Sequence, residues 1–339
     1  MTQAPLLRGL FLNALNRPVI VRPTDEDATV TLPADLAGVD AAEVAALDLP
    51  AVVSVGEETY KVTAPVRGER EISGRVAVVT GGAQGFGAEI AKGLVEQGCF
   101  VYIADLNAEG AAAKAKELGE EVAHPVTVNV ADEESVAAMA AEIEKTTGGF
   151  DLLVSNAGIV RAGSVLEQDV AAFKLSTDIN YVAFFLVTKH LGGLLAAQNK
   201  TAGAWMTDII QINSKSGLVG SNKNAAYAGS KFGGIGLVQS FALEMVEHNV
   251  KVNAICPGNF YDGPLWSDPE KGLFVQYLNS GKVPGAKTVE DVKSFYEAKV
   301  PMRRGAQGID VLRAIFYIVE QAYETGQAVP VTGGQVMMN

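Results

Sequence analysis

The chain has 339 residues, 48% of them hydrophobic and 19% charged, and its 27 basic and 39 acidic side chains give a formal net charge of −12. This length holds one large domain or two smaller ones, and the composition is typical of compact globular proteins. The negative charge disfavours nonspecific binding to nucleic acid and docking on anionic membranes. No apolar run approaches the ~18 to 20 residues that span a bilayer. We therefore expect a cytoplasmic protein that binds neither nucleic acid nor membranes.

Residues 1–73 are predicted to form a small β-containing extension. Its first apolar stretch, Leu6–Leu15, is interrupted by Arg8 and Asn13 and lacks a small-residue cleavage site, which favours a short amphipathic helix over a signal peptide. We expect the extension to have a structural role in an oligomer. Three possibilities stay open: its strands pair with a neighbouring subunit, they shield a sheet edge, or the extension is the remnant of a fusion to another domain. The strands predicted in the extension are Pro18–Val21, Thr29–Leu32, Val52–Val55 and Thr59–Val62.

Residues 74–339 alternate short Val/Ile-rich runs with helical stretches. This alternation predicts an α/β fold, a doubly wound Rossmann-type parallel sheet of about seven strands covered on both faces. The expected strands are Val76–Val79, Val101–Ala104, Val126–Val130, Leu152–Val154, Ile209–Ile212, Val250–Ile255 and Ala328–Val331. The clearest helices between them are Glu89–Glu96, Ala108–Leu118 and Ser135–Lys145, the last with Asp132 as its cap.

The connection from about residue 259 to 300 is long enough to form a substrate lid. Two patterns within it, Ser267 to Glu270 and Thr288 to Asp291, each fit an N-capping box. The aromatic residues of this segment either line the cleft or form the lid's own core, and for most of them we favour the core. They are Trp266, Phe274, Tyr277 and Tyr296.

A glycine-rich turn follows the first strand of the parallel sheet. Its glycines, at 81, 85 and 87, let the backbone approach a pyrophosphate at the start of the next helix. The second strand ends at Asp105, 24 residues after Gly81, close to the spacing expected for a carboxylate that binds the adenosine ribose. Such a carboxylate repels the 2′-phosphate of NADP, and neither Leu106 nor Asn107 offers a guanidinium to neutralise it. The sequence therefore predicts NAD as cofactor.

A second motif supplies groups for alcohol oxidation. Tyr227 follows Ser214 by 13 residues, and Lys231 stands four residues later on the same helix face. Lowering the pKa of a tyrosine by ~3 units takes about 4 kcal/mol, and we expect the Lys231 ammonium, together with an oxidised nicotinamide, to supply it. Tyr227 would then act as the base while Ser214 binds the substrate oxygen.

The glycine turn, Ser214 and the Tyr-x-x-x-Lys motif together resemble the short-chain dehydrogenase/reductase family over about residues 74–339. The resemblance implies that Ser214, Tyr227 and Lys231 are catalytic, that Lys231 also binds the cofactor ribose, and that Asn180 relays protons. It further implies a homo-oligomer, a tetramer or dimer, with interfaces on the helices around Asn180 and Tyr227.

Further cofactor contacts are implied by the same resemblance. Ser155 to Gly158 stands where the family has Asn-Asn-Ala-Gly, and Asn129 with Val130 stands where it has Asp-Val. Pro257 and Gly258 match a family Pro-Gly, but the usual downstream threonine is missing. The cofactor-binding residues expected are Gly81, Gln84, Gly85, Phe86, Gly87, Asp105, Leu106, Asn129, Val130, Asn156, Ala157, Gly158, Tyr227, Lys231, Pro257, Gly258 and Asn259.

Segments 211–217, 299–305 and 323–335 resemble one branch of the family, which interconverts polyol phosphates and ketose phosphates. A dianionic substrate needs local cations in so acidic a protein. Two alternatives stay open: the same chemistry on an unphosphorylated polyol, sugar acid or other secondary alcohol, and a non-catalytic NAD-sensing or scaffolding protein. The residues expected to contact substrate are Lys215, Lys223, Arg303, Arg304 and Trp266.

Cysteine and histidine residues predict neither a disulfide nor a metal site. Cys99 and Cys256 lie in apolar, strand-like surroundings, which is typical of buried reduced thiols. The three histidines have no ligand spacing, so we expect structural or surface roles for them. They are His124, His190 and His248.

Overall fold

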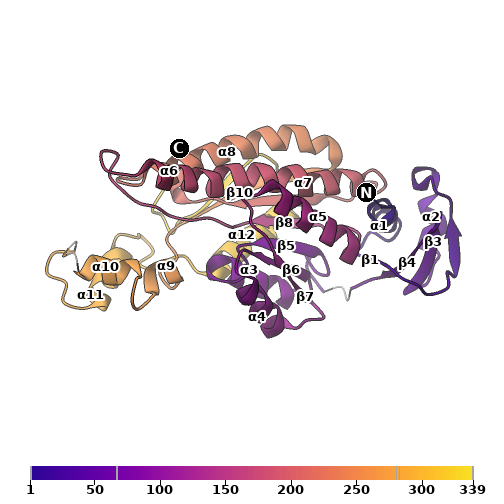
Figure 1. The fold of residues 1–339 in the computed structure, drawn as a ribbon, viewed down its shortest axis with the longest axis horizontal. Coiled ribbons are helices and arrows are strands. Elements are labelled where there is room, and N and C mark those ends of the chain that lie inside the picture. The colour runs from indigo at the N-terminus through magenta and orange to yellow at the C-terminus, as the bar shows by residue number, and fades with distance from the viewer. Residues whose placement is uncertain (1, 66–67, 280, 282, 338–339) are drawn as a thin grey trace.

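The computed structural model describes residues 2–65, 68–279, 281 and 283–337. Along the long axis the molecule has three parts, with the extension at one end, the parallel sheet and its helices in the middle, and the lid segment, residues 259–300, at the other end (Figure 1). The extension and the lid segment are therefore far apart.

Within the described residues the central sheet has seven strands, all parallel, in the order β11-β10-β9-β8-β5-β6-β7. The strand order reverses between β8 and β5, and such a switch point is where sheets of this kind bind ligands. This arrangement confirms the predicted fold class. The strands are β5 (Val76–Thr80), β6 (Phe100–Asp105), β7 (Ala123–Thr127), β8 (Leu152–Ser155), β9 (Thr207–Ile212), β10 (Val250–Pro257) and β11 (Ala328–Val331).

One predicted strand is misplaced. The third strand was expected at Val126–Val130, but β7 spans Ala123–Thr127 and includes Pro125. β7 is an edge strand, and an edge tolerates proline because one row of its N–H groups needs no partner in the sheet.

Helices cover both faces of the sheet. On one face α3, α4 and α12 share a core with β5 and β6, and on the other α5, α7 and α8 pack around a second core. The predicted helices and the Asp132 cap are confirmed, with α3 starting four residues earlier than expected. The helices are α3 (Gly85–Glu96), α4 (Ala108–Leu118), α5 (Glu133–Thr147), α6 (Val170–Thr177), α7 (Ala183–Asn199), α8 (Ala225–Met245) and α12 (Gly308–Glu320).

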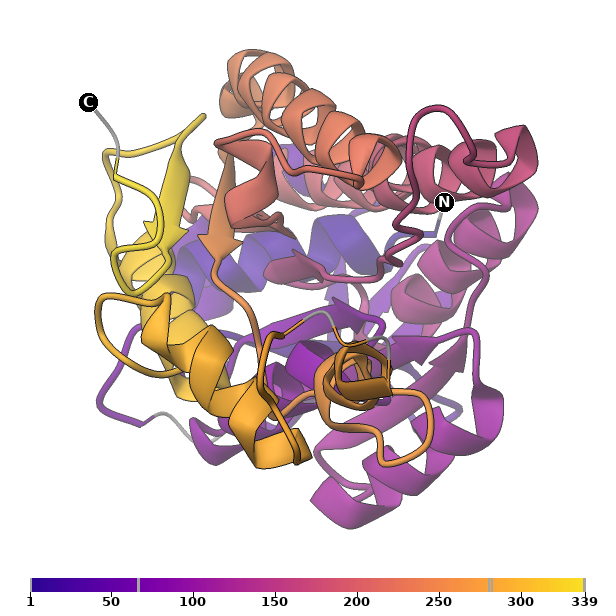
Figure 2. The same cartoon turned by 90° about the vertical axis from the view of Figure 1, so that its left-hand side faces the viewer.

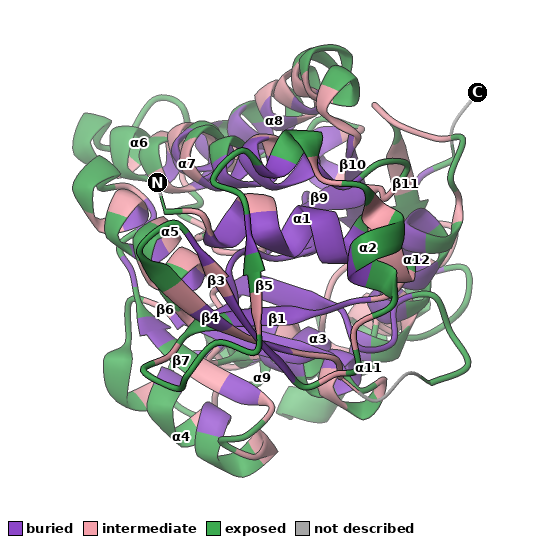
Figure 3. Cartoon of the chain, turned by 90° about the vertical axis from the view of Figure 1, so that its right-hand side faces the viewer, coloured by how far each residue is buried: buried purple, intermediate pink, exposed green. Residues whose placement is uncertain are grey.

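The extension folds around its own core. Its strands pair with one another in the order β1-β4-β3-β2, and the predicted helix is confirmed as α1 (Ala4–Leu15). Figure 3 shows α1 largely buried across the amino-terminal side of the central sheet, where it contacts α7. The remaining elements of the extension are β1 (Ile20–Pro23), β2 (Val30–Leu32), α2 (Ala41–Ala45), β3 (Ala51–Val55) and β4 (Glu58–Thr63).

A buried arginine fastens α1 to the central sheet. Arg8 is 0% exposed, and its Nη2 lies 2.7 Å from Oδ2 of Asp151, which is itself fully buried just before β8. Arg8 also donates to Gln198 at 2.6 Å and to the carbonyl of Val19 at 2.9 Å. The same Asp151 oxygen accepts the backbone N–H of Val76, so a single ion pair joins the extension to two strands.

The lid segment contains α9 (Pro264–Ser267), α10 (Leu273–Asn279) and α11 (Val289–Ala298). The capping box at Thr288 and Asp291 is confirmed. The box expected from Ser267 to Glu270 is wrong, because Asp268 accepts the backbone N–H groups of Glu270 and Lys271 instead.

An aromatic core of its own fills the lid segment. Trp266 lies with its ring centroid 4.9 Å from that of Tyr261 and 5.2 Å from those of Phe274 and Tyr296. This cluster is separate from the cores of the sheet.

The continuous helical stretch 170–199 is long and apolar enough, by length and composition alone, to cross a membrane. The expectation that no apolar stretch reaches this length is therefore wrong for this helix. It packs against α5, α8 and the sheet and places Asn180 in the candidate site, which is a role of a core helix.

Candidate active site

The site is assembled at the carboxyl ends of the central strands, on the side of the lid segment (Figure 2). Gly81 and Gly85 have φ values of +65° and +61°, which favour glycine. A Cβ atom at Gly87 would lie 2.0 Å from the carbonyl oxygen of Gly81, so only glycine lets α3 begin so close to the turn. The N-cap residue Gln84 makes no side-chain hydrogen bond to the start of α3, and the uncapped N-terminus of a helix is a suitable cradle for phosphate.

Thr80, which sequence reasoning missed, joins this turn to the neighbouring strand. Its hydroxyl accepts the backbone N–H groups of Asn156 at 3.0 Å and Ala157 at 3.1 Å, and the Asn156 amide donates to the carbonyls of Thr80 and Gly81. Asn156 therefore shapes the turn from β8. A polar residue at the last position of an apolar strand was the available signal.

Asp105 ends β6 beside the turn. Its carboxylate accepts the backbone N–H of Ala83 at 3.1 Å and that of Asn107 at 3.0 Å. Part of the side chain stays accessible, and Leu106 beside it is 70% exposed. Asp105 thus lies at the end of β6 beside the glycine turn, and its contact with a cofactor ribose stays a prediction.

The other expected cofactor contacts lie at the same edge of the sheet. Asn129 is exposed after β7, and Val130 borders the small cavity beside Asn180. Pro257 ends β10, and the backbone N–H of Gly258 donates to Val331 at 2.9 Å. Together with the glycine turn and Asp105, these positions fit a nicotinamide dinucleotide.

Ser214, Tyr227 and Lys231 converge from two elements. Ser214 follows β9, while Tyr227 and Lys231 share one face of α8. Lys231 Nζ lies 5.6 Å from the centroid of the Tyr227 ring and donates to the carbonyl of Ile212 at 2.9 Å. Ser214 is hydrogen-bonded to the Tyr227 phenol. The structure thus brings together the three residues that the motif singled out.

Burial controls the ionisation of this group. It raises the pKa of Tyr227, against the opposing effect of the Ser214 hydrogen bond, and it lowers the pKa of Lys231 to about 8. We expected Lys231 to depress the pKa of the tyrosine, and in the protein alone it does not, because desolvation of the phenolate dominates. The remaining stabilisation has to come from what binds beside the ring.

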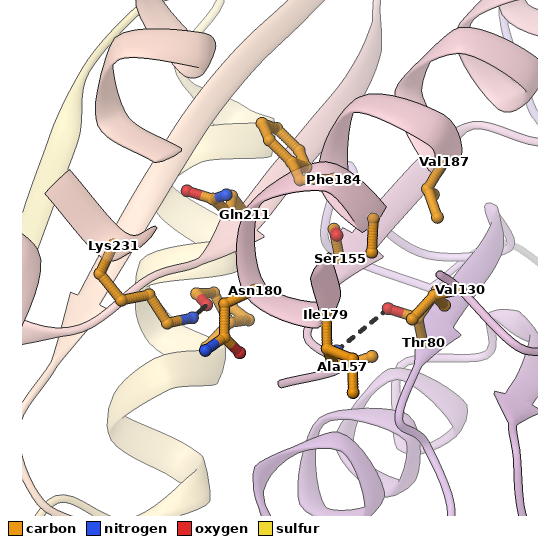
Figure 4. A pocket seen from close by; sticks show the side chains of 12 residues that line it. Thr80, Val130, Ser155, Ala157, Ile179, Asn180, Phe184, Val187, Gln211 and Lys231 are labelled. Atoms are coloured by element: carbon orange, nitrogen blue, oxygen red, sulfur yellow. Dashed lines mark hydrogen bonds between the residues drawn. The ribbon is translucent and has the colours of Figure 1, made fainter. Parts of the chain in front are cut away.

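Asn180 lies in a single π-helical turn, Asp178–Val182, between α6 and α7. Its amide exchanges two hydrogen bonds of 2.9 Å with the backbone of Ile159, which fixes its orientation. Figure 4 shows Asn180 beside the Lys231 amine. Both border a cavity of about 10 Å³, roughly the room one water molecule needs.

The candidate substrate residues differ in their surroundings. Lys215 directly follows Ser214, is half-buried and has a pKa lowered by burial, and its amine has neither an ion pair nor a hydrogen bond in the described part of the chain. Lys223 is exposed, beside the loop that follows β8. Arg303 donates to the Ala298 carbonyl, and Arg304 makes a bidentate pair with Asp310 at 2.6 and 3.0 Å.

Trp266 and Phe260 show how the lid segment relates to the cofactor turn. Trp266, which we expect to contact substrate, is only 8% exposed and lies in the lid core with the other aromatic residues, so the structure does not support a substrate contact for it. Phe260, which we had not singled out, stacks on Phe86 of the glycine turn with ring centroids 4.3 Å apart. The lid segment therefore begins in contact with the cofactor turn.

Both cysteines are buried and free, and burial raises the pKa of Cys256 to about 11. Over residues 2–65, 68–279, 281 and 283–337, no group of three or more His, Cys, Asp or Glu side chains could hold a metal ion.

The chain matches the family model described as short chain dehydrogenase over residues 75–268. It is 37% identical over 269 residues to sorbitol-6-phosphate 2-dehydrogenase of Escherichia coli strain K12, with 78% of this chain and 99% of that protein covered. The crystal structure of sorbitol-6-phosphate 2-dehydrogenase from Erwinia amylovora is similar with a TM-score of 0.70 and 37% identity, covering 77% of this chain and all of that one. The RhlG/NADP active-site complex of Pseudomonas aeruginosa has a TM-score of 0.66 at 26% identity, covering 78% of this chain and 96% of that one.

The chain therefore belongs to the short-chain dehydrogenase family. It is an oxidoreductase whose family binds a nicotinamide cofactor, which confirms the predicted family and enzyme class.

Proposed function

We propose that this enzyme interconverts a polyol phosphate and a ketose phosphate, of the sorbitol 6-phosphate and fructose 6-phosphate type, with NAD. The observation that carries the proposal is the 37% identity to a sorbitol-6-phosphate 2-dehydrogenase over 99% of that protein. The reaction suits a cytoplasmic enzyme, and we keep that location as part of the proposal.

The proposed mechanism assigns one task to each side chain. A bound oxidised NAD would supply the acceptor for the hydride of the substrate carbon, and its positive ring would favour the Tyr227 phenolate. Tyr227 takes the hydroxyl proton while Ser214 hydrogen-bonds the substrate oxygen. Lys231 holds the ribose, and Asn180 lies where a proton passing from Lys231 towards solvent would be relayed.

The choice of NAD is supported by Asp105. Asp105→Asn keeps the shape of the side chain and removes its charge. We therefore expect kcat/KM to rise with NADP and to fall with NAD. Because a hydrogen bond to a charged group is worth about 1.5 to 3 kcal/mol, the ratio of kcat/KM for the two cofactors should change by about 10- to 100-fold. Glu109→Ala, which removes an exposed charge from the first turn of α4, is the control. An unchanged ratio in Asp105→Asn would contradict the assignment.

A phosphorylated substrate is supported by Lys215, whose half-buried amine lacks a counter-charge among the described residues. We expect Lys215→Met to raise KM for sorbitol 6-phosphate about 10- to 100-fold and to leave KM for sorbitol almost unchanged. Lys61→Met is the matched control, because Lys61 lies in the extension, away from Ser214, and its amine pairs with Glu26 at 2.7 Å. Equal effects of Lys215→Met on the two substrates would argue against phosphate binding there.

The substrate itself is tested by measuring NAD reduction with sugar alcohols and their phosphates. Highest kcat/KM on sorbitol 6-phosphate is expected. Preference for an unphosphorylated polyol, a sugar acid or another secondary alcohol would replace the substrate and leave the mechanism in place. A wild type that turned over no alcohol or carbonyl compound would favour a scaffolding or sensing role.

We also propose a homo-oligomer, a tetramer or a dimer, that uses the helices around Asn180 and Tyr227. Phe185 on α7 and Phe232 on α8 support it, because each is a large apolar side chain that is 46% exposed in the single chain. Light scattering of the wild type and of Phe185→Lys tests this proposal, and a monomeric wild type would overturn it.

A further inference from the structure

A buried amide lies between the two elements that carry Ser214 and Lys231. Asn213, the first residue after β9, is 3% exposed. Its Nδ2 donates to the carbonyl of Lys231 at 2.9 Å, and its Oδ1 accepts the backbone N–H of Ser214 at 2.8 Å. One side chain therefore holds the backbone of both residues.

Neighbouring groups fix the orientation of this amide. Nδ2 of Asn213 also donates to Oε1 of Gln211 at 2.7 Å, and Gln211 is 2% exposed. A Cβ atom at Gly217 would lie 2.2 Å from Asn213 Oδ1, and one at Gly234 would lie 3.1 Å from Nδ2. The backbone thus closes tightly around the amide, and flipping it would set its oxygen against the Gln211 oxygen and the Lys231 carbonyl.

The same short segment also holds the Lys231 amine. Nζ donates to the carbonyl of Ile212, so residues 212 and 213 together bind both ends of Lys231. Ser214 is fixed from two sides as well, since its Oγ accepts the backbone N–H of Ser216 at 3.1 Å. The distance between the Ser214 hydroxyl and the Lys231 amine therefore depends on Asn213.

We propose that Asn213 is a positioning residue for dehydrogenation, which sets Ser214 and Lys231 in the register that alcohol oxidation requires. The proposal rests on the catalytic roles assigned above to those two residues. Asn213 is only 3% exposed, so we expect it to act through its hydrogen bonds and not by direct contact with substrate.

Two variants test this role. Asn213→Ala removes all three hydrogen bonds, and Asn213→Ser keeps a polar group too short to reach the Lys231 carbonyl. Because misplacing a catalytic group by about 1 Å costs up to about 10²-fold, we expect kcat to fall about 10- to 100-fold in both variants. KM for NAD should change little, and the pH profile of kcat should shift because the surroundings of Lys231 change.

Asn253→Ala provides the matched control. Asn253 is 1% exposed on the adjacent strand β10, and its amide makes hydrogen bonds to Glu324 at 3.1 Å and Gln327 at 2.9 Å, away from Ser214. It should lose thermal stability as the Asn213 variants do and keep the wild-type pH profile.

The proposal is overturned if the Asn213 variants lose stability like Asn253→Ala and keep the wild-type kcat and pH profile. It is also overturned if neither folds while Asn253→Ala does, because the role is then structural. All variants are compared on the substrate that the wild type turns over fastest in the panel. An error in the proposed polyol substrate therefore does not affect the test of Asn213.

Discussion

Tyr227→Phe is expected to lower kcat for alcohol oxidation by about 10²- to 10⁴-fold, the range that a general acid–base group contributes. The proposed mechanism assigns the hydroxyl proton to the phenol oxygen, and phenylalanine removes that oxygen while it keeps the ring. Affinity for NADH, measured by fluorescence titration, should stay near the wild-type value. Tyr102→Phe is the control, because it removes another buried tyrosine hydroxyl. Tyr102 lies on β6, and its hydroxyl is hydrogen-bonded to that of Thr147 at 2.8 Å.

The pH dependence follows from the same residue. Burial raises the pKa of Tyr227, so the phenolate that oxidation needs is scarce at neutral pH and becomes more abundant as pH rises. We therefore expect kcat/KM for oxidation to increase from pH 6 upwards and to level off above the Lys231 pKa of about 8, where the ammonium loses its proton. A wild-type kcat in Tyr227→Phe, or an oxidation rate that falls between pH 6 and 8, would contradict the assignment.

Arg8→Ala is expected to reduce the free energy of unfolding by about 3 to 5 kcal/mol, because it leaves the Asp151 carboxylate buried without its partner. The loss should appear in urea and thermal denaturation. KM for cofactor and substrate should change little, because this ion pair lies at the amino-terminal ends of the strands, away from the glycine turn.

Lys61→Ala is the control for that experiment. Its pair with Glu26 lies in the same extension but is exposed, 40% and 53% for the two side chains, so its removal should cost less than about 1 kcal/mol. Equal, small losses in both variants would show that the extension is only loosely attached.

Local patterns are sufficient for six of the seven strands of the central sheet, all except β7, and for the sequence motifs at their ends. Asp105 and the glycines are set by the turn between one strand and the next helix, and Tyr227 and Lys231 by one helix face. Each of these relations spans few residues, which is why the sequence alone shows it.

Relations between distant segments were not predictable. Arg8 interrupts an apolar run and was interpreted as the polar side of an amphipathic helix, but its partner Asp151 lies 143 residues further on. No local pattern singles out Asn213, because its hydrogen bond to the Lys231 carbonyl depends on how α8 packs beside β9. The Val-rich run Val126–Val130 predicts the third strand too late, because only the position of β7 at the sheet edge makes Pro125 acceptable within it.

The extension and the lid segment occupy opposite ends of the molecule (Figure 1), and α1 covers the side of the sheet that faces away from the lid segment and the candidate site. A tether attached ahead of α1 would therefore point away from arriving substrate. The enzyme could be immobilised on a bead or electrode through a tether ahead of α1, with its candidate active site facing away from the support.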